Sequence, residues 1–255
     1  MAMNPRLLRP RASFQAPFSP SSIAGLAGWY DASDLATLFE NSNGTGAASG
    51  GGPVGYWQDK SGTGNHATQS GSTSLKPTLE ASSTNGKASL SFNNASLQCL
   101  KFAANPLAGS AAGTGFYVCR GTLGEDACIG HPLGKFGTPT EADHYPCGGF
   151  TQYSSWGRSL RMSFSYNPPF TSTHVGVVMS RSADWRFWFK DTLATTETGD
   201  VVWGGDPGIG GNPNEADGAF YYPGVVCEVL LYAAAVSDAD RATITNYLVA
   251  KWGVA

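Results

Sequence analysis

Charged residues are scarce in this 255-residue chain, at 14% against about 25% in an average globular domain. The formal net charge is −3 and the isoelectric point is about 5.8, so no broad positive field favours nucleic acid or an anionic membrane as partner. No run approaches the roughly 18 apolar residues of a membrane span. No apolar stretch follows the N-terminal arginines either, so we expect neither a transmembrane helix nor a secretory signal peptide.

The cysteines lack the spacing of a metal or redox site. None of the five forms a CxxC pair, and no histidine stands at zinc-ligand spacing from two of them. We interpret most of them as small buried hydrophobes in a chain made in a reducing cytoplasm. Cys119 and Cys128 flank a glycine-rich turn and could pair after oxidation. The five are Cys99, Cys119, Cys128, Cys147 and Cys227.

Glycine and proline are plentiful, with 33 and 15 residues, beside 41% hydrophobic residues. This composition is typical of many short strands joined by turns. Over 160–166 apolar and polar residues alternate, which indicates a sheet with one solvated face. We therefore predict an all-β sandwich. Its expected strands are 26–30, 54–58, 88–92, 97–102, 115–119, 160–166, 174–180, 185–190, 200–203 and 225–232.

One helix is expected after the last strand. Ser237 is a candidate N-cap with Asp240 three residues later, which resembles a capping box. Ile244, Leu248 and Trp252 recur at helical spacing, and Gly253 follows as a stop signal. The pattern predicts an amphipathic helix over about 238–252 that packs on the sandwich.

Residues 1–20 should form an extended arm, separate from a domain over 21–255, because four prolines interrupt them. The arm either orders on a partner or packs back on its own domain as a frayed terminus. Its candidate docking residues are Arg6, Leu7, Leu8, Arg9, Arg11, Phe14 and Phe18.

Several ordered segments resemble laminin-G-like jelly-roll domains of the concanavalin type, which occur in bacterial surface proteins and phage virion proteins. They are LAGWYDASD at 26–34, WQDKSGTGNHATQ at 57–69, EVLLY at 228–232 and YLVAKWG at 247–253. The stretch from about 105 to 160 departs from the family as a divergent insert. The resemblance implies a concanavalin/laminin-G-like jelly-roll sandwich with the C-terminal helix and the extended N-terminal arm.

With its N-terminal arm and no expected signal peptide, the chain resembles short phage virion proteins. The resemblance implies a non-enzymatic structural protein that decorates a capsid or belongs to a tail or fibre, assembled in the host cytoplasm. Its expected partners are other virion proteins, further copies of itself and host surface polysaccharide. The alternatives are a carbohydrate-binding module of a bacterial surface protein and a glycanase.

The glycanase alternative finds little support in the residues. Retaining glycanases on this fold place two carboxylates on one strand, typically as E-x-D-x-x-E, and the sequence has no such run. Glu125 and Asp126 are adjacent and would face opposite sides of a strand. No G-x-S-x-G elbow or Walker loop occurs. We expect no catalytic residues.

Ligand sites are predicted in loops. Exposed aromatic rings can stack on sugars, and the candidates are Tyr145, Tyr153, Trp156, Tyr221 and Tyr222. Those of 143–157 could equally form a subunit interface. Oxygen ligands suited to Ca²⁺, the only cofactor expected, gather around Asp31, Asp34 and Asp59 and in a second loop. The alternative is that they make turns, and we interpret Asp59-x-Ser61-Gly62 as a tight turn secured by the Asp59 carboxylate. The second loop offers Asp206, Asn212, Asn214 and Asp217.

Overall fold

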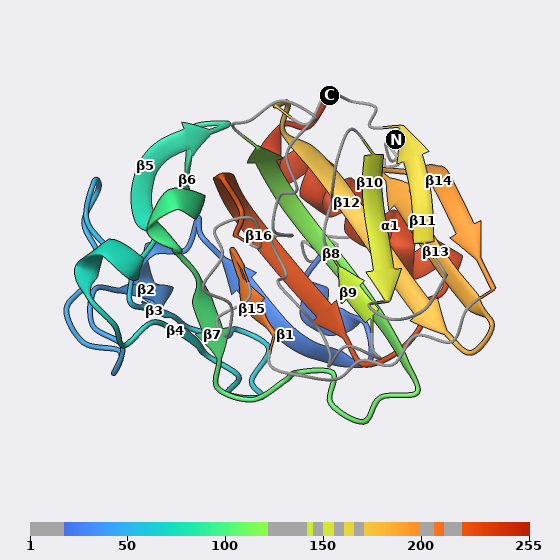
Figure 1. Ribbon diagram of the computed structural model, residues 1–255, viewed down its shortest axis with the longest axis horizontal. Coiled ribbons are helices and arrows are strands. Elements are labelled where there is room, and N and C mark those ends of the chain that lie inside the picture. Colours follow the sequence, from blue (N-terminus) through green and yellow to red (C-terminus); the bar gives the residue numbers. More distant parts are fainter. Residues whose placement is uncertain are drawn as a thin grey trace, which may run out of the picture.

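The computed structural model describes residues 18–121, 142–144, 150–155, 161–165, 171–198, 207–211 and 221–255. They form an antiparallel β-sandwich with one C-terminal α-helix, which confirms the predicted all-β class (Figure 1). No described helix is long and apolar enough to cross a bilayer.

The largest sheet of the described residues has eight strands, in the order β14-β13-β12-β8-β16-β6-β5, with β1 paired to the second half of β16. Its edges are β14 (Thr192–Glu197) and β5 (Thr78–Thr84). The sequence pattern missed both edges, because they are rich in threonine, serine and alanine and show no apolar alternation. The inner strands are β13 (Asp184–Phe189), β12 (His174–Arg181), β8 (Ala112–Gly121), β16 (Gly224–Tyr232), β6 (Lys87–Phe92) and β1 (Leu26–Asp31).

Two smaller sheets complete the described strands. The first runs in the order β15-β7-β4-β3-β2, with β15 (Gly208–Ile209), β7 (Leu100–Phe102), β4 (Ala67–Thr68), β3 (Tyr56–Trp57) and β2 (Leu38–Phe39). The second is β11-β10-β9, with β9 (Ala142–His144), β10 (Phe150–Ser155) and β11 (Arg161–Ser165). The expected strand at 200–203 lies outside the described residues.

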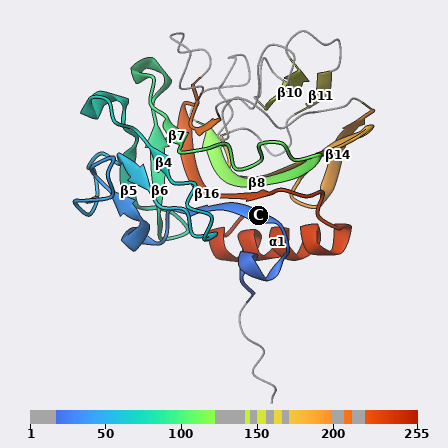
Figure 2. The ribbon, with the colours of Figure 1, turned by 90° about the horizontal axis from the view of Figure 1, so that it is seen from below.

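Each face of the large sheet has its own core. Along β8, Tyr117 and Cys119 point into the core shared with the five-stranded sheet, whereas Phe116 and Val118 point toward the helix. This alternation follows from the two-residue period of a strand. Both faces are covered, so β8 and β16 are buried along almost their whole length. Figure 2 shows helix α1 on one side of the sheet and β10 and β11 on the other.

Helix α1 spans Asp238–Trp252, as predicted. The Ser237 Oγ accepts a hydrogen bond of 3.1 Å from the backbone N–H of Asp240 and donates one of 2.7 Å to its carboxylate. Gly253 ends the helix in the left-handed conformation with φ of +65°, which glycine adopts at little cost. The buried stripe of Ile244, Leu248 and Trp252 packs on the large sheet.

The expectation that the cysteines are buried is confirmed for those that the structure describes. Cys99, Cys119 and Cys227 are free and buried. Four tryptophans, Trp57, Trp185, Trp188 and Trp252, are core residues, and Trp29 is half-buried. Cys128 and Cys147 lie outside the described residues.

Candidate functional site

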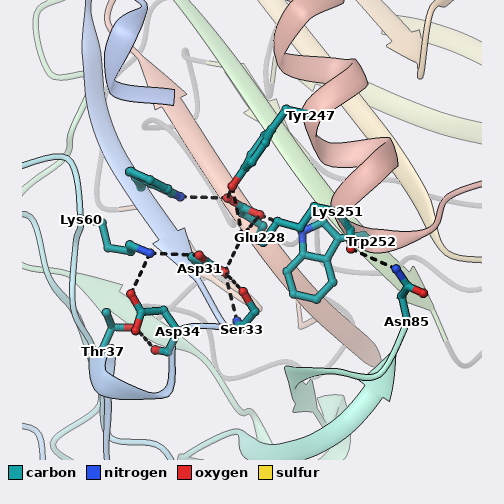
Figure 3. Close-up of polar contacts among 11 residues, drawn as sticks. Asp31, Ser33, Asp34, Thr37, Lys60, Asn85, Glu228, Tyr247, Lys251 and Trp252 are labelled. Carbon is teal, nitrogen blue, oxygen red and sulfur yellow. Dashed lines mark hydrogen bonds and ion pairs between the residues drawn. The ribbon is translucent and has the colours of Figure 1, made fainter. Parts of the chain in front are cut away.

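The motif segments at 26–34, 57–69, 228–232 and 247–253 meet beside the C-terminal end of helix α1 (Figure 3). Asp31 on β1 is paired with Glu228 on β16, so both carboxylates lie on the same face of the large sheet. Tyr247 and Lys251 are four residues apart in α1, so both side chains lie on the side of the helix that faces these carboxylates. We call Asp31, Asp34, Lys60, Glu228 and Lys251 the charged cluster.

Glu228 is fully buried, at 0% exposure, and uses both carboxylate oxygens. Its Oε1 accepts hydrogen bonds from the Trp29 Nε1 at 2.8 Å and the Tyr247 hydroxyl at 2.9 Å. Its Oε2 accepts from the Trp252 Nε1 and pairs with the Lys251 Nζ, both at 2.7 Å. Burial raises the pKa of Glu228, and the charge of Asp31 adds to this, while Lys251 opposes it.

Lysine side chains join the carboxylates into a chain. The Lys251 Nζ lies 2.8 Å from the Asp31 Oδ1, and the Lys60 Nζ lies 3.0 Å from the Asp31 Oδ2 and 2.8 Å from the Asp34 Oδ2. Burial alone would raise the pKa of Asp31, but the two lysines and a hydrogen bond from Ser33 lower it below its usual value.

The arrangement of the charged cluster suits a structural role. Glu228 and Asp31 are 0% and 4% exposed, so neither carboxylate is open to a substrate. Their oxygens are already engaged by donors from β1, the loop at 60 and α1. The cluster therefore holds these segments in register. Removing one partner from such a buried pair is costly, because it leaves an uncompensated charge.

Asp59 holds the neighbouring turn by the same means. Its Oδ1 accepts from the backbone N–H groups of Trp29 at 2.9 Å and Ser61 at 2.8 Å. Its Oδ2 accepts from the hydroxyls of Ser61 and Thr63 at 2.7 and 2.9 Å and from the backbone N–H of Asn65 at 3.2 Å. The structure confirms the interpretation of this segment as a turn secured by its aspartate.

The predicted calcium ligands that the structure describes are bound to protein groups. In the ranges that the structure describes, no group of three or more His, Cys, Asp or Glu side chains could hold a metal ion. Asp31, Asp34 and Asp59 are instead engaged by lysines and N–H or hydroxyl donors. The second set, Asp206, Asn212, Asn214 and Asp217, lies outside the described residues.

The expected exposure of Tyr221 and Tyr222 for sugar stacking is wrong, because they are 4% and 0% exposed. The Gly210–Gly211 turn covers them: the Gly210 carbonyl accepts from the Tyr222 N–H at 2.7 Å, and a Cβ at Gly211 would lie 2.5 Å from the Tyr221 ring. Only glycine permits this approach.

The remaining predicted ligand-binding residues fall largely outside the structure's description. Tyr145 and Trp156 are outside it, and Tyr153 is described only through the backbone of β10. Of the candidate docking residues in the arm only Phe18 is described, and its ring packs on Tyr247 at 5.5 Å between centroids. The docking candidates outside are Arg6, Leu7, Leu8, Arg9, Arg11 and Phe14.

The charged cluster was not anticipated from the sequence, although two signals pointed to it. Glu228 is a single charge inside the apolar run VVCEVLLY, and Lys251 stands between buried positions of the helix stripe. An isolated charge in such a position needs a buried partner of opposite sign.

Comparisons with known proteins show the fold. No family model matches the chain, and no curated protein matches it. Among solved structures, domain 4 of AbnA, an extracellular arabinanase of Geobacillus stearothermophilus solved with arabinotriose, superposes with a TM-score of 0.56 at 11% identity. That match covers 86% of this chain and 98% of the domain.

Two larger proteins contain a similar sandwich. The binding domain of Paraclostridial Mosquitocidal Protein 1 gives a TM-score of 0.60 at 9% identity, over 90% of this chain and 55% of that one. A Trypanosoma rangeli sialidase gives 0.54 at 12% identity, over 88% of this chain and 33% of the sialidase. At such low identity these likenesses establish a shared β-sandwich fold.

Proposed function

We propose that this chain is a non-enzymatic carbohydrate-binding β-sandwich, displayed on a phage particle through its N-terminal arm. The observation that carries the binding role is the likeness to the arabinanase domain, which was solved with arabinotriose and is covered over 98% of its length. A sandwich that matches a whole sugar-bound domain is a reasonable scaffold for the same kind of ligand.

The non-enzymatic part of the proposal rests on how the motif carboxylates are used. Glycosidases need an acid and a second carboxylate on either side of the scissile bond. In this chain Asp31 and Glu228 are buried beneath α1 and paired with Lys251, and Asp59 accepts four hydrogen bonds from its turn and one from Trp29. The carboxylates of Asp31, Glu228 and Asp59 therefore stabilise the fold.

The display role rests on the arm. Phe18 packs on Tyr247 of α1, and the Pro20 carbonyl accepts a 3.1 Å hydrogen bond from the buried hydroxyl of Tyr232. Residues 18–20 therefore belong to the sandwich, and the docking segment is the part before Phe18. Its arginines and apolar residues are suited to ordering on a second protein.

A carbohydrate-binding module of a bacterial surface protein is the second candidate. It is favoured by the same neighbour, because that domain is one part of an extracellular enzyme. Antibodies against the purified chain distinguish the two. Labelling of released phage particles in electron microscopy supports display on a virion, and labelling of the cell surface alone supports the module.

The binding role is tested on the full chain. We expect retardation in affinity gels that contain arabinan or other neutral polysaccharides, without release of reducing ends from them. Absence of binding across a glycan array would contradict the proposal. Release of reducing ends by the purified chain would contradict its non-enzymatic part.

A further inference from the structure

The five-stranded sheet carries two rows of side chains that its register keeps apart. Leu38, Trp57, Ala67 and Phe102 are direct partners across β2, β3, β4 and β7 and are all buried. The positions next to them form the other row and point to the opposite face. We call this half-buried set the outer row: Phe39, Tyr56, Thr68 and Lys101.

Aromatic rings gather at one end of the outer row. Phe39 and Tyr56 make an edge-on contact with ring centroids 5.7 Å apart. His66, two residues before Thr68 and hence on the same face, lies 5.0 Å from the Tyr56 ring at an interplanar angle of 35°. Strands β2, β3 and β4 of this sheet lie at the end of the molecule opposite β14 (Figure 1).

Polar groups without a hydrogen-bond partner in the described part of the chain lie next to these rings. The Nδ1 of His66 accepts a hydrogen bond of 3.1 Å from the backbone N–H of Asp59, which assigns the proton of the neutral ring to Nε2. That Nε2–H and the hydroxyls of Tyr56 and Thr68 have no hydrogen-bond partner among the residues that the structure describes. A sugar hydroxyl can donate to or accept from groups of this kind.

Gly44 packs against one part of the Tyr56 ring. Its φ is +77°, and a Cβ at this position would lie 3.4 Å from the Tyr56 Cζ and 3.6 Å from two further ring carbons, which is ordinary van der Waals contact. The backbone of Gly44 therefore lies over the ring near its hydroxyl, and a ligand can reach only the rest of the ring. The left-handed conformation favours glycine at this position.

The outer row carries little charge. Lys101 is its one charged side chain, beside the uncharged Phe39, Tyr56 and Thr68. A strongly anionic ligand would need a strongly positive surface, so this row favours a neutral one. With strands spaced at about 4.8 Å, the four-strand row extends roughly 14 Å, the length of a short oligosaccharide.

We infer that the outer row, together with His66, is a binding subsite for a neutral oligosaccharide. The sugar packs on the parts of the Tyr56 and Phe39 rings that Gly44 and His66 leave uncovered, and its hydroxyls bond to the His66 Nε2–H and the hydroxyls of Tyr56 and Thr68. Stacking on an aromatic face combined with a few fixed polar groups is how proteins orient such ligands. The inference rests on the proposed carbohydrate-binding function and adds its location and ligand class.

The test uses the full chain and two probes, arabinotriose as the neutral sugar and sialyllactose as the acidic one, in isothermal titration calorimetry. Tyr56→Ala should weaken binding of the neutral probe at least tenfold. Tyr56→Phe, which keeps the ring and removes only the hydroxyl, should weaken it about threefold. Far-ultraviolet circular dichroism and thermal unfolding should show both variants folded, because Tyr56 is half-buried.

The outcomes also separate this inference from the function on which it rests. If the parent chain binds neither these probes nor any glycan on an array, the proposed function fails and the subsite fails with it. If binding survives Tyr56→Ala but is lost in Trp156→Ala, the function stands and the subsite is wrong. A preference for sialyllactose over the neutral sugar would overturn the ligand class.

Discussion

Replacing Lys251 with methionine tests whether the charged cluster is ionised in the folded chain. Methionine retains most of the apolar stem but removes the cation 2.7 Å from Glu228 and 2.8 Å from Asp31. Asp31 still has Lys60, whereas Glu228 retains only neutral donors. Removing one partner of a buried ion pair typically costs about 3–5 kcal/mol, which lowers the Tm of a chain of this size by roughly 10 °C.

The cost should depend on pH in a defined direction. Burial already raises the pKa of Glu228, and loss of Lys251 raises it further. The folded variant then binds a proton that the unfolded chain releases above the ordinary carboxyl pKa of 4.5. Its stability should therefore rise as pH falls from 8 toward 5, by at most about 1.4 kcal/mol per pH unit.

Urea unfolding at several pH values, followed by tryptophan fluorescence, measures both effects. Lys76→Met is the matched control, because its Nζ makes an exposed hydrogen bond to a backbone carbonyl, and it should cost less than about 1 kcal/mol. Adding Glu228→Gln to Lys251→Met should recover stability at pH 8 and flatten the pH dependence. A loss below about 1 kcal/mol for Lys251→Met, with no dependence on pH, would refute the reasoning.

Three further predictions concern the described core. Burial lowers the pKa of His174 to about 4, so folding stability should fall as pH drops from 6.5 toward 4, by at most about 3 kcal/mol. Unfolding curves of His174→Gln should lack this contribution, and the same dependence of stability on pH in the variant would contradict it. Gly176→Ala should lower the free energy of unfolding by about 1–3 kcal/mol, because the added Cβ would lie 2.2 Å from the Tyr117 ring. A melting temperature equal to the parent's would contradict that packing. Asp59→Ala leaves several donors of its turn unpaired and should lower stability by about 1–3 kcal/mol, with faster amide hydrogen exchange at 61–65 as the diagnostic; unaltered exchange would count against its role.

The predictable parts of the fold are those set by interactions between residues close together in the sequence. Helix α1 begins and ends where its caps, Ser237 and Gly253, stand in the sequence. The turn after Trp57 was also read correctly, because Asp59 bonds to donors within six residues of itself. Strands β5 and β14 were missed since polar edge strands take their conformation from the neighbouring strand to which they bond.

The candidate sites were less predictable, because exposure is a property of the whole fold. Tyr221 and Tyr222 stand beside a proline and resemble a surface pair in the sequence, yet the Gly210–Gly211 turn covers them. Tyr56 lies within an expected strand and gave no indication of a binding role. Its half-exposed position depends on the register of β2, β3 and β4.

The sequence by itself determined the all-β class, the single C-terminal helix and the aspartate-secured turn, because alternation, capping and turn chemistry act over a few residues. Only the tertiary structure decided that Asp31, Glu228 and Lys251 form one buried cluster, since Asp31 and Lys251 stand 220 positions apart along the chain (251 − 31). It also decided which aromatic rings are covered and which border free polar groups. Side-chain burial depends on which strands pair and in what register, and that is settled when distant segments pack together.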